Sequence, residues 1–227
     1  MSALTVIQSA AIQLIGQSPP TVFGSTEQTM VELRTLMNVV SADIAEAYGW
    51  PKLTKLATFT GDGVTGQFAP PADYSQMVKD GAIYSTRSMM PLARARDLKQ
   101  WLEFQITPVV GYPGYWIIIG DDFHILPTLN PAEQAKFYYI TKNIWAGDKE
   151  AATVDDDTFL LSEKVLILGL ILRYRQNKRL DDAADLHNYQ TALSEEIARS
   201  KGSRTIAIGA ARISDGAEVG YPGMIIP

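Results

Sequence analysis

The sequence predicts an α+β protein, mainly a helical bundle formed by the N- and C-terminal helices, with an inserted small β-rich module and an extended C-terminal arm. Three observations predict this class. Apolar residues recur at helical spacing near the start of the chain, short β-type runs fill its middle, and helical spacing returns near its end. We expect residues 1–50 and 153–200 to form the helical core, residues 51–152 the β-rich module and residues 201–227 the arm.

Two helices are expected in the first fifty residues. Apolar residues between Leu4 and Ile15 fall on one face of the first helix, and Pro19-Pro20 ends it. Ser25 or Thr26 is typical of the N-cap of a second, long helix, which Tyr48-Gly49-Trp50-Pro51 ends. The apolar residues of this second helix, three and four apart, are Met30, Leu33, Met37, Val40, Ile44 and Ala47.

The middle of the chain is expected to contain short strands. Its runs are rich in β-branched and aromatic residues and are broken by Gly, Pro, Asp and Asn. The clearest strand candidates are Lys55–Thr60, Ala82–Arg87, Tyr115–Ile119 and Phe137–Ile140. A short helix is expected over Arg96–Phe104, and a turn at Pro71–Tyr74.

The helical pattern returns at Asp155-Asp156-Asp157, because acidic residues at a helix start complement the helix dipole. This helix is expected to run to about Gln176, and a second one from Asp181 to about Ser200. Their short connection predicts an antiparallel helical hairpin. The alternating apolar residues and apolar end of the remaining chain predict an arm that docks on another subunit. The candidate arm residues are Arg204, Ile206, Ile208, Arg212, Ile213, Tyr221, Met224, Ile225 and Ile226.

The glycine-rich stretch TFTGDGVTGQFAPPADY, Thr58 to Tyr74, suggests several kinds of loop. A phosphate-binding loop needs a following helix and a lysine, and a dinucleotide fingerprint needs a βαβ unit. A calcium loop needs several oxygen ligands, and only Asp62 offers a carboxylate between Gly61 and Gly66. We therefore expect a β-hairpin of Leu56–Thr60 and Val64–Phe68, with Asp62-Gly63 at its tip.

A second candidate site is GDDFHIL, Gly120 to Leu126. Asp122 and His124 could ligate iron or manganese, but a third ligand is missing, and Gly-Asp-Asp is also a common turn. A hairpin of Trp116–Ile119 and Phe123–Leu126 is the favoured interpretation. We expect no catalytic residue, no cofactor and no metal. The alternative is a metal-dependent enzyme or a glycan-binding module centred on the β-rich region.

Composition narrows the function classes further. The net charge of −5 gives no basic footprint for reading nucleic acid, although an acidic protein suits a passage through which DNA slides. The absence of cysteine excludes disulfides, thiolate nucleophiles and zinc–sulfur sites. The apolar run Val165–Leu172 is far shorter than the ~20 residues of a membrane-spanning helix. The N-terminus lacks the basic region with which a signal peptide begins, so we do not expect a signal peptide there.

From Ile7 to about Glu196 the chain resembles phage head–tail adaptor (connector) proteins. In that family an N-terminal helix and a long second helix lead through a tryptophan-containing turn into a β segment that ends in a P-x-D-Y/F motif. Trp50 and Pro71–Tyr74 occupy those places here. The aromatic strand FYYITKNIW, Phe137–Trp145, the three aspartates, and the apolar helix LLSEKVLILGLILRYRQNKRLDDAADLHNYQTALSEE follow in the same order.

The resemblance implies a non-enzymatic structural protein of the virion, made in the host cytoplasm. It implies a homo-oligomeric ring of about twelve copies beneath the portal protein that extends the DNA channel. Tail tube, nozzle or tail-completion proteins would attach to this ring. It also implies transient, non-specific contact with genomic double-stranded DNA, and no membrane.

Two groups of residues are candidates for such contacts. Basic residues are dense near the end of the first C-terminal helix, and we expect them at a subunit or portal interface or facing DNA. This basic set is Arg173, Arg175, Lys178 and Arg179. The exposed tip Asp62-Gly63 is a candidate contact to the next protein of the tail.

Overall fold

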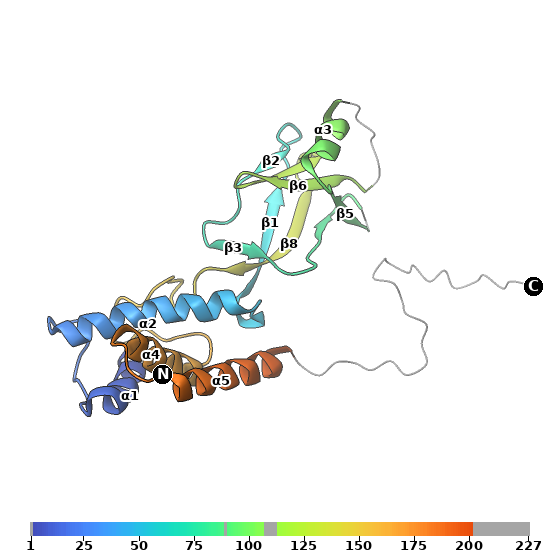
Figure 1. Ribbon diagram of the computed structural model, residues 1–227. Coiled ribbons are helices and arrows are strands. Elements are labelled where there is room, and N and C mark those ends of the chain that lie inside the picture. The colour runs from blue at the N-terminus through green and yellow to red at the C-terminus, as the bar shows by residue number, and fades with distance from the viewer. Residues whose placement is uncertain (1, 89, 107–112, 202–227) are drawn as a thin grey trace, which may run out of the picture.

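The computed structural model describes residues 2–88, 90–106 and 113–201 (Figure 1). These residues form five α-helices and an eight-stranded sheet that curls nearly into a barrel. The prediction of a mainly helical bundle is therefore wrong. The sheet is larger than a module of short strands would be, because strands far apart in the sequence pair with each other and enclose a core of their own.

Four of the helices share one apolar core. They are α1 (Ala3–Ile15), α2 (Gln28–Ala47), α4 (Glu163–Asn177) and α5 (Ala183–Lys201). The predicted apolar face of α2 is buried from Met30 to Ile44, whereas Ala47 is exposed. Ion pairs join the two ends of α4 to opposite ends of α5, Lys164 to Glu195 and Arg175 to Asp185. The predicted antiparallel helical hairpin is therefore confirmed.

The start of α2 differs from the prediction. Its N-cap residue is Glu27, which makes no side-chain capping bond. The Ser25 hydroxyl accepts a hydrogen bond from the Glu27 N–H at 3.2 Å. Ser25 therefore closes the turn before the helix instead of capping it. At its other end, α2 stops as predicted, and the Trp50 indole N–H donates to the Ile44 carbonyl at 2.7 Å.

The three aspartates do not begin a helix, because α4 begins eight residues after Asp155, at Glu163. Instead, Asp155 accepts hydrogen bonds from the N–H groups of Val22 and Phe23, at 3.0 and 3.1 Å. Asp157 is buried and accepts from the N–H groups of Thr153 and Val154 within its own loop. A carboxylate binds several free N–H groups in a loop as readily as at a helix start, and the sequence does not distinguish the two.

The sheet has the strand order β1-β8-β4-β5-β6-β7-β2, and β3 also pairs with β8. All pairs are antiparallel except β5 with β6. Its strands are β1 (Thr54–Thr60), β2 (Gln67–Phe68), β3 (Tyr74–Met77), β4 (Ile83–Ser85), β5 (Pro91–Arg94), β6 (Tyr115–Ile119), β7 (Asp122–Leu126) and β8 (Gln134–Thr141). The inward side chains include Phe59, Phe123 and Phe137, whose rings lie 4.8–5.4 Å apart. The four predicted strands are confirmed, although β4 is shorter than expected.

The predicted hairpin at Asp62-Gly63 is wrong. Strand β1 pairs with β8 over seven residues, and β2 pairs with β7, so the two arms of the expected hairpin do not pair with each other. The Asp62 carboxylate accepts from the N–H groups of Val64 and Thr65, at 2.8 and 2.7 Å. This Asx-type turn redirects the chain toward β7. The other predicted hairpin, β6 with β7, is confirmed, with Gly120 at φ 61° in its turn.

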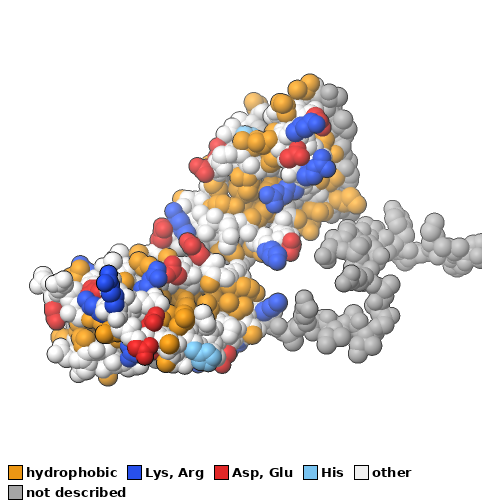
Figure 2. All heavy atoms as spheres, in the orientation of Figure 1, with side chains coloured by type: hydrophobic (Ala, Val, Ile, Leu, Met, Phe, Trp, Pro, Cys, Tyr) orange, Lys and Arg blue, Asp and Glu red, His pale blue; other side chains and the backbone are white. Residues whose placement is uncertain are grey.

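The predicted short helix is α3 (Leu98–Ile106), and it lies on the outer side of the sheet. Its Trp101 packs on Ile117, and the Phe104 ring stacks on Tyr115 with centroids 4.0 Å apart. A short 3-10 helix, η1 (Pro51–Leu53), connects α2 to β1. Figure 1 shows the helices and the sheet as two parts that meet where β1 begins and β8 ends, and the space-filling view in Figure 2 shows the same two parts.

Candidate assembly surfaces

The basic set lies at the end of α4, and three of its four side chains pair with acids of the same chain. Arg175 Nη1 lies 2.6 Å from Asp185 Oδ2 on α5, and Lys178 Nζ lies 2.7 Å from Glu32 Oε2 on α2. Arg173 Nη2 lies 3.6 Å from Asp43 Oδ2, also on α2. The hydrogen bond to Glu32 raises the pKa of Lys178. These pairs join the helices, so little of the positive charge is left for another molecule.

The loop that carries Asp62 and Gly63 is exposed but held at its base. Gly63 has φ 84°, and a Cβ there would lie 3.0 Å from the ring of Pro131. The Gly61 N–H donates to the Glu133 carbonyl at 2.7 Å. Hydrogen bonds from the Thr65 hydroxyl and from two backbone N–H groups lower the pKa of Asp62 to about 2. The side chain of Val64 is 80% exposed, so the loop presents an apolar residue on a fixed turn.

A buried carboxylate supports this loop. The Glu133 side chain accepts hydrogen bonds from the Ser85 hydroxyl and from the Asn130 N–H. Arg87 donates to it from Nε and Nη2, at 3.1 and 2.8 Å. Burial raises the pKa of Glu133, but these donors outweigh burial and lower it overall. The Arg87 guanidinium therefore neutralises the buried Glu133 carboxylate, next to the exposed turn.

The turn at Pro71–Tyr74 is confirmed, and its aspartate links this corner to strands β1 and β8. Asp73 accepts from Lys55 Nζ, Tyr139 Oη and Thr141 Oγ1, each at 2.8 Å. Burial opposes its ionisation, but the three hydrogen bonds lower the pKa of Asp73 to about 2. Lys55 also pairs with Asp148 at 2.7 Å, and the bonds to both aspartates raise its pKa. The sequence showed the motif but not this network.

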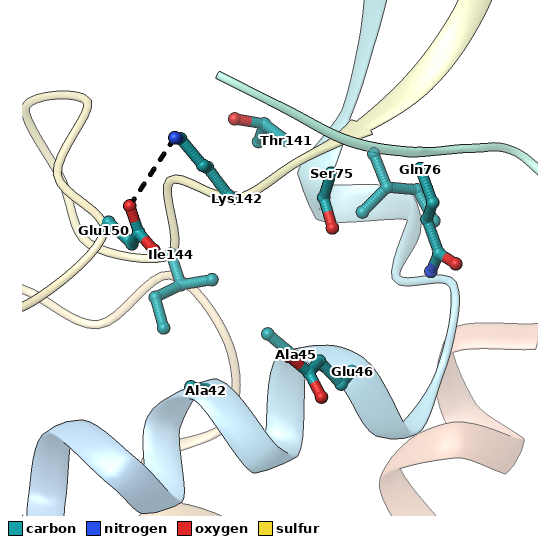
Figure 3. A pocket seen from close by; sticks show the side chains of 10 residues that line it. Ala42, Ala45, Glu46, Ser75, Gln76, Thr141, Lys142, Ile144 and Glu150 are labelled. Carbon is teal, nitrogen blue, oxygen red and sulfur yellow. Dashed lines mark ion pairs between the residues drawn. The ribbon is translucent and has the colours of Figure 1, made fainter. Parts of the chain in front are cut away.

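A small cavity lies beside this junction (Figure 3). It is lined by Ala42, Ala45 and Glu46 of α2, by residues of β3 and β8, and by the Lys142–Glu150 ion pair at 3.7 Å. Its volume is about 80 Å³, whereas small-molecule sites measure roughly 300–1,000 Å³. The cavity has room for a few waters rather than for a substrate.

Helix α3 exposes an apolar stripe on the side that faces away from the sheet. Leu98, Leu102 and Ile106 follow each other at intervals of four residues, so they line one side of the helix. Their exposed fractions are 61%, 54% and 73%. We call these three residues the α3 stripe. An apolar row this exposed is typical of a protein–protein contact.

A second exposed apolar surface lies on the outer side of β1, β8 and β4. Leu56 on β1 is directly opposite Tyr138 on β8, and Tyr84 on β4 is opposite Lys136 of the same strand β8. The side chains of Leu56, Tyr138 and Tyr84 are each more than half exposed. We call Leu56, Tyr84, Lys136 and Tyr138 the β1–β8–β4 face. The sequence did not reveal it, because the three strands are far apart in the chain.

The residues considered for a metal are used otherwise. Gln67 Nε2 donates to Asp122 Oδ2 at 2.6 Å, and the His124 ring lies edge-on to Trp101 at 6.3 Å. Residues 2–88, 90–106 and 113–201 hold no group of three or more metal-ligating side chains. Nor does this part of the chain include a helix long and apolar enough to cross a membrane. Of the predicted arm, residues 201–227, Lys201 is the last residue of α5, and the rest lies outside the described residues.

Comparison with known proteins gives the family. The model of the SU10 adaptor protein family matches residues 1–213. The chain belongs to that family. The SU10 adaptor proteins are a phage head–tail adaptor family, so the predicted resemblance is confirmed. A search of curated proteins returns no matching sequence.

Membership of the SU10 adaptor family defines the kind of site to look for. An adaptor binds head and tail components, so its functional residues form surfaces that contact other proteins. The described residues offer three: the Asp62 loop, the α3 stripe and the β1–β8–β4 face. Of these, sequence reasoning found only the loop. Helical spacing of Leu98, Leu102 and Ile106 was the signal that could have revealed the α3 stripe.

Proposed function

We propose that this SU10 adaptor protein assembles as a ring of about twelve copies beneath the portal, extends the DNA channel and gives tail proteins their attachment surface. The family match over residues 1–213 carries this proposal. The exposed apolar surfaces support it, because a protein that works alone rarely exposes several of them. The net charge of −5 also supports it, because like charge lets DNA slide without adhering.

In this proposal the chain divides into three units, as the sequence predicts. Residues 1–50 and 153–200 form the helical part, residues 51–152 the sheet, and residues 201–227 an arm that reaches the portal or a neighbour. Two separate apolar cores support the first division, although Ile144 and Trp145 pack with the helices. The exposed Val64 supports a tail contact at the Asp62 loop.

The ion pairs of the basic set favour some of its predicted contacts over others. Because three of its four charges are paired inside the subunit, we favour a subunit or portal interface over DNA for these residues. Arg179→Glu tests this, since Arg179 has φ 56° in the α4–α5 turn and its change breaks none of the three pairs. We expect weaker portal docking. Lys79→Glu, at an exposed position of the turn after β3, is the matched control. Equal docking of both variants would contradict the proposal.

Electron microscopy tests the function itself. Purified protein, alone and mixed with the portal protein, is imaged in negative stain, and rings with a central hole are expected at the portal. Phage that lack the gene should fill heads with DNA but carry no tails. Tailed, infectious particles without this protein would refute the adaptor role.

The arm has its own experiment. Deletion of residues 203–227 should leave the helical circular-dichroism signal unchanged and weaken ring or portal assembly. A truncated protein that assembles like the full chain would contradict the proposed arm. A longer truncation, of residues 194–227, also removes the end of α5 and shows what loss of folding does to the same signals.

A further inference from the structure

The α3 stripe and the β1–β8–β4 face lie on opposite walls of the barrel. In the strand order, α3 covers β6 and β7, which come three and four strands after β8. In a sheet that closes nearly into a ring of seven strands, this separation is half of the circumference. The two exposed apolar surfaces therefore face away from each other, and one subunit cannot bring them together.

Neither surface is needed for the fold of its own subunit. The other side of α3 already buries Trp101 and stacks Phe104 on Tyr115. Strands β1 and β8 send Ala57, Phe59 and Phe137 into the barrel core, so Leu56 and Tyr138 point outward. The outer wall at β6 and β7 is covered by α3, whereas the outer wall at β1, β8 and β4 exposes its large apolar side chains.

The two surfaces match in length. Leu98 and Ile106 are eight residues apart, so the α3 stripe is about 12 Å long at 1.5 Å per residue. On the other wall, Leu56 lies about 5 Å from Tyr138 across the strand pair, and Tyr84 about 7 Å from Tyr138 on the diagonal. That row is also about 12 Å long.

Their charges match as well. Lys136 lies within the β1–β8–β4 face, between Tyr84 and Tyr138, and is exposed. Glu103 follows Leu102 on the outer side of α3 and is also exposed. Within the described residues, neither Glu103 nor Lys136 forms an ion pair. The α3 stripe therefore has an unpaired acid beside it, one turn after the exposed Lys99, and the β1–β8–β4 face has an unpaired base.

We infer that the α3 stripe of one subunit packs on the β1–β8–β4 face of the next copy, with Glu103 of one facing Lys136 of the other. Two different surfaces on opposite sides of a subunit give a heterologous contact, which forms a ring when the rotation from copy to copy closes. This inference rests on the proposed ring and adds to it the pair of surfaces that holds neighbours together. The contact drives association of the purified protein as well as assembly on the portal.

Cross-linking tests the pairing, and the cysteine-free sequence suits this test. Leu102→Cys and Tyr138→Cys are made in separate chains and treated with a short bis-maleimide reagent. We expect a cross-linked dimer only when the two variants are mixed, and a ladder of oligomers from the chain that carries both. A dimer from Leu102→Cys alone, or no cross-link in any mixture, overturns the pairing. The pair Ile12→Cys and Tyr138→Cys is the control, because Ile12 is exposed on α1.

Charge exchange gives a second, independent measurement. Glu103→Lys and Lys136→Glu should each weaken association about tenfold in sedimentation velocity, and the double variant should recover most of it. Both side chains are exposed, so each single variant should keep its melting temperature. Equal association of all four proteins overturns the inference. If rings form but Leu102→Cys and Tyr138→Cys do not cross-link, only this contact is overturned. If tailed particles form without the protein, the adaptor function itself is overturned.

Discussion

The hydroxyl of Tyr139 lies 2.8 Å from Oδ1 of Asp73, and this bond joins the corner before β3 to the strand β8. Lys55 and Thr141 donate to the other carboxylate oxygen. The aspartate of the P-x-D-Y motif therefore has a structural role at the point where helices and sheet meet. Burial and the bond to Asp73 raise the pKa of Tyr139 to about 12, so the phenol is protonated and can donate this bond at neutral pH.

Replacement of Asp73 by Asn should lower the free energy of unfolding by about 1–2 kcal/mol at pH 7, because hydrogen bonds to a charged acceptor are lost at a partly screened site. The folded pKa of about 2 lies below the usual value near 4. The stabilisation from ionised Asp73 is therefore full above about pH 4 and is lost as the pH falls toward 2. Urea unfolding at several pH values should show the wild-type and the variant converging below pH 4. Asp156→Asn, at an exposed position, should show no such convergence.

The Glu133–Arg87 pair should be more sensitive to removal of the arginine than to removal of both partners. Arg87→Ala leaves a buried carboxylate without its cation, which costs roughly 2–4 kcal/mol at a site of this burial. A double variant with Glu133→Ala should therefore lose less stability than Arg87→Ala alone. Thermal unfolding of the four proteins gives the coupling. Strict additivity would show that the pair contributes nothing.

Gly169 of α4 should not tolerate a larger side chain. A Cβ there would lie 2.6 Å from Val40 Cγ1 and 2.9 Å from the Tyr189 ring, so α4 packs closely against both α2 and α5. Gly169→Val should cost about 1–3 kcal/mol through overpacking. Lys164→Val, on an exposed position of the same helix, is the control for valine in a helix, although it also removes the exposed ion pair with Glu195. A melting temperature for Gly169→Val equal to that of the control would contradict this packing.

Variants of the Asp62 loop should distinguish an effect on the stability of the protein from an effect on tail attachment. Val64→Ser removes an apolar side chain that is 80% exposed, so unfolding should be unchanged while tail attachment falls. Asp62→Asn keeps a side-chain acceptor for the two N–H groups of the turn and should preserve both properties. Tail attachment to isolated heads, counted by electron microscopy, is the measurement. Full attachment with Val64→Ser would show that the loop is not the tail contact.

Local signals in the sequence predicted most elements of the fold. The spacing of Met30 to Ile44 predicted α2, and the turn at Gly120 predicted the hairpin of β6 and β7. What failed was pairing between distant segments. The tight-turn signal of Asp62-Gly63 is real, but β1 gains seven residue pairs with β8, which begins more than seventy residues later. Local turn preference is weaker than such a ladder, and no short-range pattern reports it.

Contacts between distant segments also determined the partners of charged residues and the composition of surfaces, and the sequence did not show these contacts. Asp155 and Asp157 were recognisable as acceptors of N–H groups, but their donors, Val22 and Thr153 among them, follow only from the folded chain. The basic set was visible, whereas its partners on α2 and α5 were not. The β1–β8–β4 face requires the strand order itself. Sequence patterns therefore indicated which residues are polar or apolar, and the topology determined what they meet.

Strand β8 belongs to both halves of the molecule. Ala135, Phe137 and Tyr139 fill the barrel, and Ile140, the next residue, is buried among the helices. In the adaptor role proposed above, a load on the sheet would reach the helices along one continuous backbone, which pairs with β1 on one side and with β3 on the other. Antiparallel ladders pulled along their length resist in shear, with all their hydrogen bonds loaded together. The connection between the sheet and the helices is thus a paired strand whose successive residues belong to both cores, rather than a single unpaired linker.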